Sequence, residues 1–250
     1  MIRAEALKLL GLLGVRVTVA LAVVLPPVMT MLTSRQIQGN LDSGRPGAFI
    51  DTRDLAYGEL MFLVPCAIVI GVLAVSSEYR INSATPAASR QIGTTLLAQP
   101  FPWVVVLVKA GVVAVLTALT AALALALSGG VAHLVLGEFD WGPRPTVRIL
   151  AAVGFWVSIA LLASGVTWVT RSGLIPLVVL ILNSSLLSLT YLLSQVTDLV
   201  RFLPDAAAIG VVLTTAPLEP QSPLAVGVIL ASWPIAALLI GGLALTRRDA

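Results

Sequence analysis

The sequence predicts an all-α integral membrane protein with six transmembrane helices. Apolar residues make up 58% of its 250 positions and charged residues only 11%, whereas a soluble domain carries about 25% charged residues. Long runs without a charged residue recur along the chain, and a helix of roughly 17–25 apolar residues is enough to cross the hydrocarbon layer. Polar segments separate these runs. We therefore expect one transmembrane domain over residues 1–250.

The first element expected is an amphipathic helix over residues 1–16. Its apolar residues recur at spacings of three and four, and its charged residues occupy the remaining arc. Such a helix is expected to lie on the membrane surface. The first span follows over residues 17–34. A secretory signal peptide would end at a small-residue cleavage site after a shorter apolar core, but this run continues through Pro26 and Pro27, so we expect the span to be retained.

Five further spans are expected from the other apolar runs. They cover residues 60–77, 102–127, 149–170, 172–195 and 223–246. Residues 35–59, between the first two spans, contain Gly39, Gly44, Pro46 and Gly47 and are expected to form a loop.

Three local features qualify this pattern. Pro65 lies inside the second span, where it is tolerable if a neighbouring helix satisfies the carbonyl that proline leaves free. Arg171 alone separates spans four and five, which should form a close hairpin. The apolar segment 206–218 has only 13 residues, which is short for a span and fits a re-entrant or interfacial helix.

The distribution of charge predicts the orientation. With six spans, one membrane face carries nine basic residues against three acids, a net charge of +6, and the other carries six basic residues against nine acids, a net charge of −3. Loops rich in Lys and Arg stay in the cytoplasm. The face with nine basic residues, which includes both termini and the loop between spans two and three, is therefore predicted to be cytoplasmic.

The polar segment between spans two and three, residues 76–109, is the candidate functional site. A polar segment of this kind does not contribute to the hydrophobic core. It is a place where a soluble protein could bind a membrane-embedded chain. Glu78, Tyr79 and Arg80 leave the second span directly, and residues 94–100, TTLLAQP, lead into the third.

Lys109 lies about two turns into the third span. At a rise of 1.5 Å per residue, it is roughly 10 Å along the helix from Pro102, within reach of the interface for a long side chain. A charge left at the membrane centre would cost about 2.5–3.5 kcal/mol. We therefore expect Lys109 to anchor the cytoplasmic boundary, together with Arg3 and Lys8 of the amphipathic helix.

These elements together resemble a known family. E-Y-R after span two, T-L-L-A-x-P and a lysine at span three, a basic amphipathic amino terminus and a closing R-R-D-A are similar to the small six-span permease subunit of ABC-2 type transporters. The resemblance covers the whole chain. Members often have glycine where this chain has Asn82, and a basic pair where it has Phe101 and Pro102.

The resemblance implies a bacterial inner membrane protein with both termini cytoplasmic. It implies a cytoplasmic coupling helix between spans two and three that docks into a separate ATPase, an amphipathic helix that braces it, and a short re-entrant hairpin before span six. The residues that it assigns to ATPase coupling are Glu78, Tyr79, Arg80, Thr94, Thr95, Leu96, Leu97 and Pro100. Closure of the ATPase would tilt the helix bundles and release cargo outward.

The nucleotide that supplies energy and its metal ion are expected to bind a partner protein. The sequence has no G-x-x-x-x-G-K-[ST] phosphate loop, so ATP and Mg²⁺ would bind the ATPase, and we expect no cofactor, metal or catalytic residue in this chain. The expected partners are two ATPase copies, a second permease copy, identical or paralogous, and the lipid bilayer. A net charge of +3 is too small to indicate nucleic acid.

Span five is the most polar of the apolar runs. Its candidates for lining a transport pathway are Asn183, Ser184, Ser188 and Tyr191, although small polar residues in spans also bond helix to helix. The aliphatic composition of the spans favours a hydrophobic or amphiphilic cargo, such as an antibiotic, drug, lipid or lipopeptide.

Two other function classes remain open. The chain could be a non-transporting membrane partner, such as a sensor or immunity subunit. It could also be an ion-coupled secondary carrier, which is disfavoured because all twelve acids lie outside the long apolar runs and such carriers place ionisable groups near the midplane.

Overall fold

The structure is a computed structural model that describes residues 1–43, 51–79, 91–99, 101–137, 139–185, 190, 193, 196–216 and 221–248. The described residues form helices and turns, with no strand among them. Within these described ranges, five helical segments are long and apolar enough to cross a membrane: Leu13–Asn40, Tyr57–Tyr79, Pro102–Leu136, Pro145–Thr170 and Pro223–Arg247. The prediction of an all-α membrane protein is therefore confirmed.

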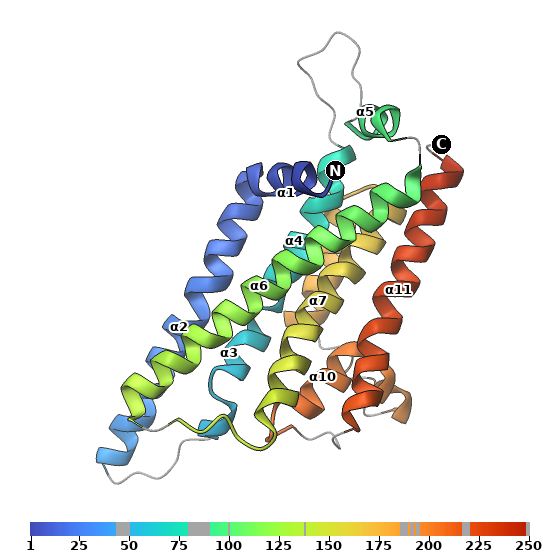
Figure 1. Cartoon of the computed structure of the whole chain (residues 1–250). Coiled ribbons are helices and arrows are strands. Elements are labelled where there is room, and N and C mark those ends of the chain that lie inside the picture. Colours follow the sequence, from blue (N-terminus) through green and yellow to red (C-terminus); the bar gives the residue numbers. More distant parts are fainter. Residues whose placement is uncertain are drawn as a thin grey trace.

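The amino-terminal helix α1 (Ile2–Gly11) lies across one end of the bundle, the same end at which the last helix of the chain finishes (Figure 1). We call this the terminal end and the other the far end. Leu12 adopts an extended backbone, with φ −72° and ψ 119°, which separates α1 from the long helix α2 (Leu13–Asp42). The surface helix thus ends at Gly11 rather than at Arg16.

Helices α2 and α6 (Pro102–Leu136) extend well beyond the spans expected from the sequence. With 35 residues, α6 is about 50 Å long at 1.5 Å per residue, compared with a hydrocarbon layer of about 30 Å. The two helices pack along each other (Figure 1). The loop prediction for residues 35–59 was wrong over residues 35–42 and 57–59, which lie in α2 and in the helix Tyr57–Phe62. Ile37 packs against Leu55 and Ala132, and this contact supports the extension of α2.

The second span is interrupted. It consists of α3 (Tyr57–Phe62), α4 (Val64–Ser76) and the short helix η2 (Ser77–Tyr79). Pro65 in the first turn of α4 has no N–H to donate. At the break, the indole N–H of Trp156 donates to the Leu60 carbonyl over 3.1 Å. A side chain of the neighbouring helix therefore provides a hydrogen bond to a backbone carbonyl at the interruption. Backbone polar groups inside a membrane need such partners.

Helix α7 (Pro145–Thr170) is the centre of the bundle, and it packs against α4, α6, α8, α10 and α11. Glycines permit its closest contacts. A Cβ added to Gly71 on α4 would lie 2.1 Å from the Ala160 carbonyl oxygen, and one added to Gly165 would lie 2.6 Å from the Ala237 backbone. Small residues at such crossings let helix backbones approach closely.

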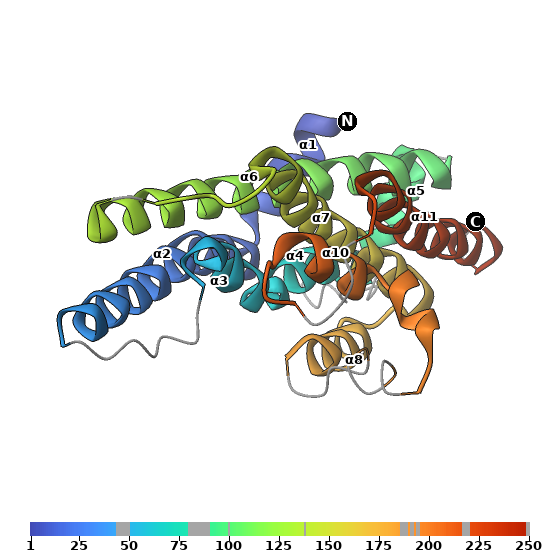
Figure 2. The same cartoon turned by 90° about the horizontal axis from the view of Figure 1, so that it is seen from below.

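The carboxy-terminal part contains the shorter elements. They are α8 (Leu174–Ser185), η3 (Asp198–Phe202) and α10 (Pro204–Val212), and the long helix α11 (Pro223–Arg248) follows them. Helices α6 and α8 lie on opposite sides of α7 (Figure 2). In the described part of the expected fifth span, 12 residues form α8, and residues 186–189, 191, 192, 194 and 195 lie outside that part. The short segment 206–218 contains a helix that ends at Val212, followed by a turn at Thr214 and Thr215.

Candidate functional site

Four elements meet at the terminal end of the bundle: α1, η2, α6 and the short helix α5 (Gln91–Ala98). Figure 1 shows α1 and α5 across the ends of the long helices. Polar side chains from all four elements converge there. We call this group the Glu78 cluster; its members are Glu5, Lys8, Glu78, Thr95 and Lys109.

Glu78 is the acceptor at the centre of the cluster. Its Oε1 accepts a hydrogen bond from Lys109 Nζ at 2.9 Å and another from Lys8 Nζ. Its Oε2 accepts from Thr95 Oγ1 at 3.1 Å. Lys109 Nζ also donates to Glu5 Oε2 at 2.7 Å. One carboxylate therefore joins side chains from three other helices.

The charges of the cluster balance within a buried environment. The side chain of Glu78 is 0% exposed and that of Lys109 is 6% exposed, whereas Lys8 is 23% exposed. Two carboxylates face two ammonium groups, so the cluster carries no net charge when all four are ionised. A buried charge is tolerated when it is paired and hydrogen-bonded, and this arrangement meets that condition.

Local sequence explains how α1 contributes two partners. Glu5 and Lys8 are three positions apart, so they share a helix face, and Lys8 Nζ lies 4.0 Å from Glu5 Oε1. The extended backbone at Leu12 allows α1 to leave the axis of α2. This places the polar face of α1 against Glu78.

The structure brings together four of the residues singled out by the sequence, namely Lys8, Glu78, Thr95 and Lys109. Glu5 was missed as a candidate, although its spacing from Lys8 was a usable signal. Arg3 is exposed on α1. Of the remaining predicted residues, Arg80, Asn82 and Pro100 lie outside the described part of the chain, and only the helical backbone is described for Thr94.

Helix α5 has one buried and one exposed side. Leu96 packs against a small core that includes Val75 and Trp168. The ring of Tyr79 meets the Trp168 ring edge-on, with centroids 6.0 Å apart. In contrast, Leu97 is 88% exposed and Phe101, just beyond the helix, is 67% exposed. The chain therefore presents large apolar side chains at the terminal end, next to the Glu78 cluster.

Two of the four predicted pathway residues are described. Asn183 and Ser184 lie on α8 and line a pocket of about 500 Å³ that α4, α7 and α10 also border. Ser188 and Tyr191 lie outside the described residues.

A second polar group at the far end was not anticipated from the sequence. Arg148 Nη2 lies 2.6 Å from Asp54 Oδ1. The Arg148 guanidinium also donates to the backbone carbonyls of Arg53, Trp141 and Val212 at 2.8–3.0 Å. This Asp54–Arg148 pair joins the start of α7, the end of α10, the short helix η1 (Thr52–Asp54) and the loop at Trp141.

The carboxylate of Asp54 is held by more than Arg148. The backbone N–H groups of Thr214 and Thr215 and both of their hydroxyls donate to it, over 2.8–3.0 Å. Burial raises the pKa of the Asp54 carboxyl, but these hydrogen bonds outweigh burial and hold its pKa below the ordinary value of 3.8. Asp54 is therefore an ionised anchor for the turn after α10.

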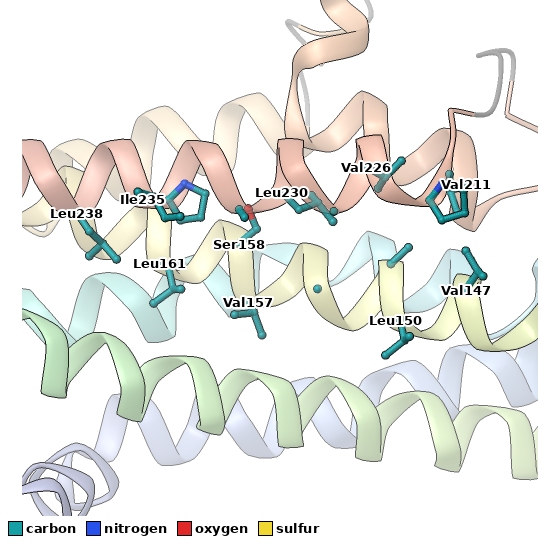
Figure 3. A pocket seen from close by; sticks show the side chains of 16 residues that line it. Val147, Leu150, Val157, Ser158, Leu161, Val211, Val226, Leu230, Ile235 and Leu238 are labelled. Carbon is teal, nitrogen blue, oxygen red and sulfur yellow. The ribbon is translucent and has the colours of Figure 1, made fainter.

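A third feature is an apolar groove between α7 and α11. It has a volume of about 550 Å³, and Ser158 is the polar side chain in its wall. Figure 3 shows Val157 and Leu161 of α7 near Leu230 and Ile235 of α11 along this groove. Such a surface suits lipid chains or another apolar helix. None of the described residues in its wall is charged.

Within the described residues, no group of three or more His, Cys, Asp or Glu side chains could hold a metal ion. The fold and its two buried charge groups define a helical multi-span membrane protein. Comparisons with protein-family models, curated proteins and solved structures find no match to the chain.

Proposed function

We propose that the chain is the membrane-spanning subunit of an ATP-driven exporter and that a separate ATPase moves it through α5. The observation that carries this proposal is the Glu78 carboxylate, which is fully buried and bonded to side chains of α1, α5 and α6. A displacement of α5 would therefore be transmitted to a long helix and to the surface helix together. Rigid-body tilting of helices is an established kind of switching motion.

The exposed side of α5 supplies a contact for a soluble partner. Leu97 and Phe101 are exposed beside the Glu78 cluster, whose charged side chains are paired. Exposed apolar side chains next to polar groups are typical of protein interaction sites. In the proposed orientation, with both termini cytoplasmic, this surface faces the compartment that holds ATP.

The remaining parts of the proposal come from the resemblance to ABC-2 permeases, together with the composition of the chain. The chain lacks a phosphate loop, so ATP and Mg²⁺ would bind two ATPase copies. A second permease copy, identical or paralogous, would complete the pathway in a bacterial inner membrane. The region 172–195 would add one span to the five long helices, as the fifth in chain order. The η3–α10 segment, which includes the start of the apolar run 206–218, would be the re-entrant hairpin before the sixth span, α11. An apolar bundle favours a hydrophobic or amphiphilic cargo.

Site-specific photo-crosslinking in native membranes tests the docking surface. A photoreactive residue at Leu97 is expected to capture a chain that contains a phosphate loop and binds ATP. The matched control is the same probe at Leu199, a similarly exposed leucine of η3, which should not capture it. The proposal fails if position 97 captures no nucleotide-binding chain or if both positions capture it equally.

A second measurement tests coupling rather than docking. Glu78→Gln keeps the size of the side chain but removes its charge. With the captured ATPase reconstituted in vesicles, we expect binding to persist while cargo-dependent ATP hydrolysis falls roughly tenfold, within the usual range of coupling free energies. Unchanged hydrolysis would contradict a coupling role for Glu78.

A further inference from the structure

The pocket bordered by α4, α7, α8 and α10 has the size and lining of a small-molecule site. Its volume is about 500 Å³, within the range of roughly 300–1,000 Å³ that is usual for such sites. Most of the wall is apolar and includes Ile68, Phe155, Ile159 and Trp233. A few polar groups complete it, which is the usual composition of a ligand pocket.

One of these polar groups is a carboxylate. Asp205 lies in the first turn of α10. Among the lining residues that the structure describes, it is the acidic one, and none of them is Lys or Arg. The hydroxyl of Thr190 donates to Asp205 Oδ2. The ion pairs found among the described residues do not involve Asp205. This differs from Asp54, Glu5 and Glu78, each of which faces a basic side chain.

Part of the stabilisation of Asp205 has an ordinary structural source. A negative charge in the first turn of a helix interacts favourably with the helix dipole, and the Thr190 hydroxyl adds a hydrogen bond. No basic side chain in the described part of the chain pairs with this carboxylate, which lies beside an apolar cavity. A positively charged group on a bound molecule would supply a counter-charge, and the aromatic rings of Phe155 and Trp233 would also attract a cation.

We propose that this pocket binds a drug-sized apolar molecule with one positive charge, which lies against Asp205 while its apolar body fills the space between α4, α7 and α8. Binding of such a molecule to the chain does not depend on an ATPase. The conclusion that the transported cargo is a hydrophobic cation rests on the proposed function.

The test compares two ions of similar size and opposite charge. Tetraphenylphosphonium and tetraphenylborate are titrated onto the purified full-length chain in non-ionic maltoside micelles, without an ATPase. We expect at least tenfold tighter binding of the phosphonium ion by the native chain. Asp205→Asn should weaken phosphonium binding at least tenfold and leave borate binding equal or stronger.

Two further variants keep the test decisive. Asp198→Asn removes the same charge from an exposed position of η3 and should leave phosphonium binding unchanged. Ile159→Trp fills the pocket without changing its charge and should weaken phosphonium binding. The proposal is overturned if both ions bind the native chain equally, or if neither Asp205→Asn nor Ile159→Trp affects phosphonium binding.

Competition identifies the source of the natural ligand. Phosphatidylethanolamine, a zwitterionic membrane lipid whose headgroup carries an ammonium group beside its phosphate, and a water-soluble aromatic amine without a lipid chain are each added to the phosphonium complex. Displacement by the lipid assigns the site to a membrane amine, and displacement by the amine alone assigns it to a soluble cation. Displacement by neither contradicts the proposal. Failure here leaves the crosslinking result at Leu97 untouched, so the two proposals can fail separately.

Discussion

Lys109 donates to Glu78 across 2.9 Å, and this buried pair joins α6 to η2. Water cannot replace the hydrogen bond between the two side chains, because both are almost completely buried. Removing Lys109 leaves the Glu78 carboxylate with the partly exposed Lys8 as its ammonium partner, and removing Glu78 leaves Lys109 with Glu5. Losing the buried partner of a buried charge is costly, whereas removing both charges together can cost little. The two residues are therefore expected to behave as a unit.

The first prediction concerns this pair. Lys109→Met should reduce the free energy of unfolding by about 3–5 kcal/mol, the usual cost of removing one member of a buried pair. The double variant Lys109→Met/Glu78→Gln should lose clearly less than the sum of the two single variants. Thermal unfolding in maltoside micelles, arranged as a double-mutant cycle, measures the difference. Additive losses would refute the interaction.

Lys8→Met is the matched control for this cycle. Lys8 also donates to Glu78, but its side chain is partly exposed. Exposed ion pairs contribute about 0–1 kcal/mol, so the loss should be much smaller than for Lys109→Met. An equal loss would show that burial does not set the strength of these contacts.

The cluster also shows which part of the site the sequence could predict. Glu78, Thr95 and Lys109 stand out individually, because a charge or hydroxyl at the end of an apolar run is conspicuous. Their contacts depend on the extended backbone at Leu12, which directs α1 toward η2. Leu12 forms that turn between two helical segments. Leucine is a common helix-forming residue, so the residue itself does not predict a turn at this position.

Long-range packing limited the fold prediction in the same way. The apolar runs predicted most of the long helices, because the length of a run is a local property. The extension of α2 to Asp42 depends on the contact of Ile37 with Leu55 and Ala132. The Asp54–Arg148 pair spans 94 positions, so composition and spacing gave no reason to connect its members.

The second prediction concerns pH. Because the pKa of Asp54 is lower in the folded protein than its ordinary value of 3.8, Asp54 contributes stability above that value and loses it as the pH falls through the folded pKa. Thr214→Val/Thr215→Val removes two of the donors. The folded pKa should then rise, so the double variant should lose less stability between pH 5 and pH 2 than the native chain.

Melting temperatures measured across this pH range give the comparison. Asp42→Asn, at an exposed position near the end of α2, is the control, and its acid dependence should match that of the native chain. If the valine variant shows the same or a larger acid loss, the hydroxyls of Thr214 and Thr215 do not lower the Asp54 pKa.

The third prediction concerns the crossing of α4 and α7. Gly71→Ala places a Cβ 2.1 Å from the Ala160 carbonyl oxygen, so the helices must separate, at a cost of about 1–3 kcal/mol. Gly111→Ala on α6 is the control, because its Cβ meets no atom within 4 Å. It should be neutral or stabilise by up to about 1 kcal/mol. Equal melting temperatures for the two variants would disprove the close crossing.

The fourth prediction concerns the break between α3 and α4. Trp156→Phe removes the indole donor to the Leu60 carbonyl, which also accepts from Leu63 N–H over 3.2 Å. The lost bond should cost about 0.5–1.5 kcal/mol, with an added cost for lost packing. Trp233→Phe removes a comparable 2.8 Å bond to the Phe202 carbonyl at an exposed position, where the cost should be smaller. Unfolding measurements that rank Trp233→Phe as the more damaging change would show that α7 does not support the broken span.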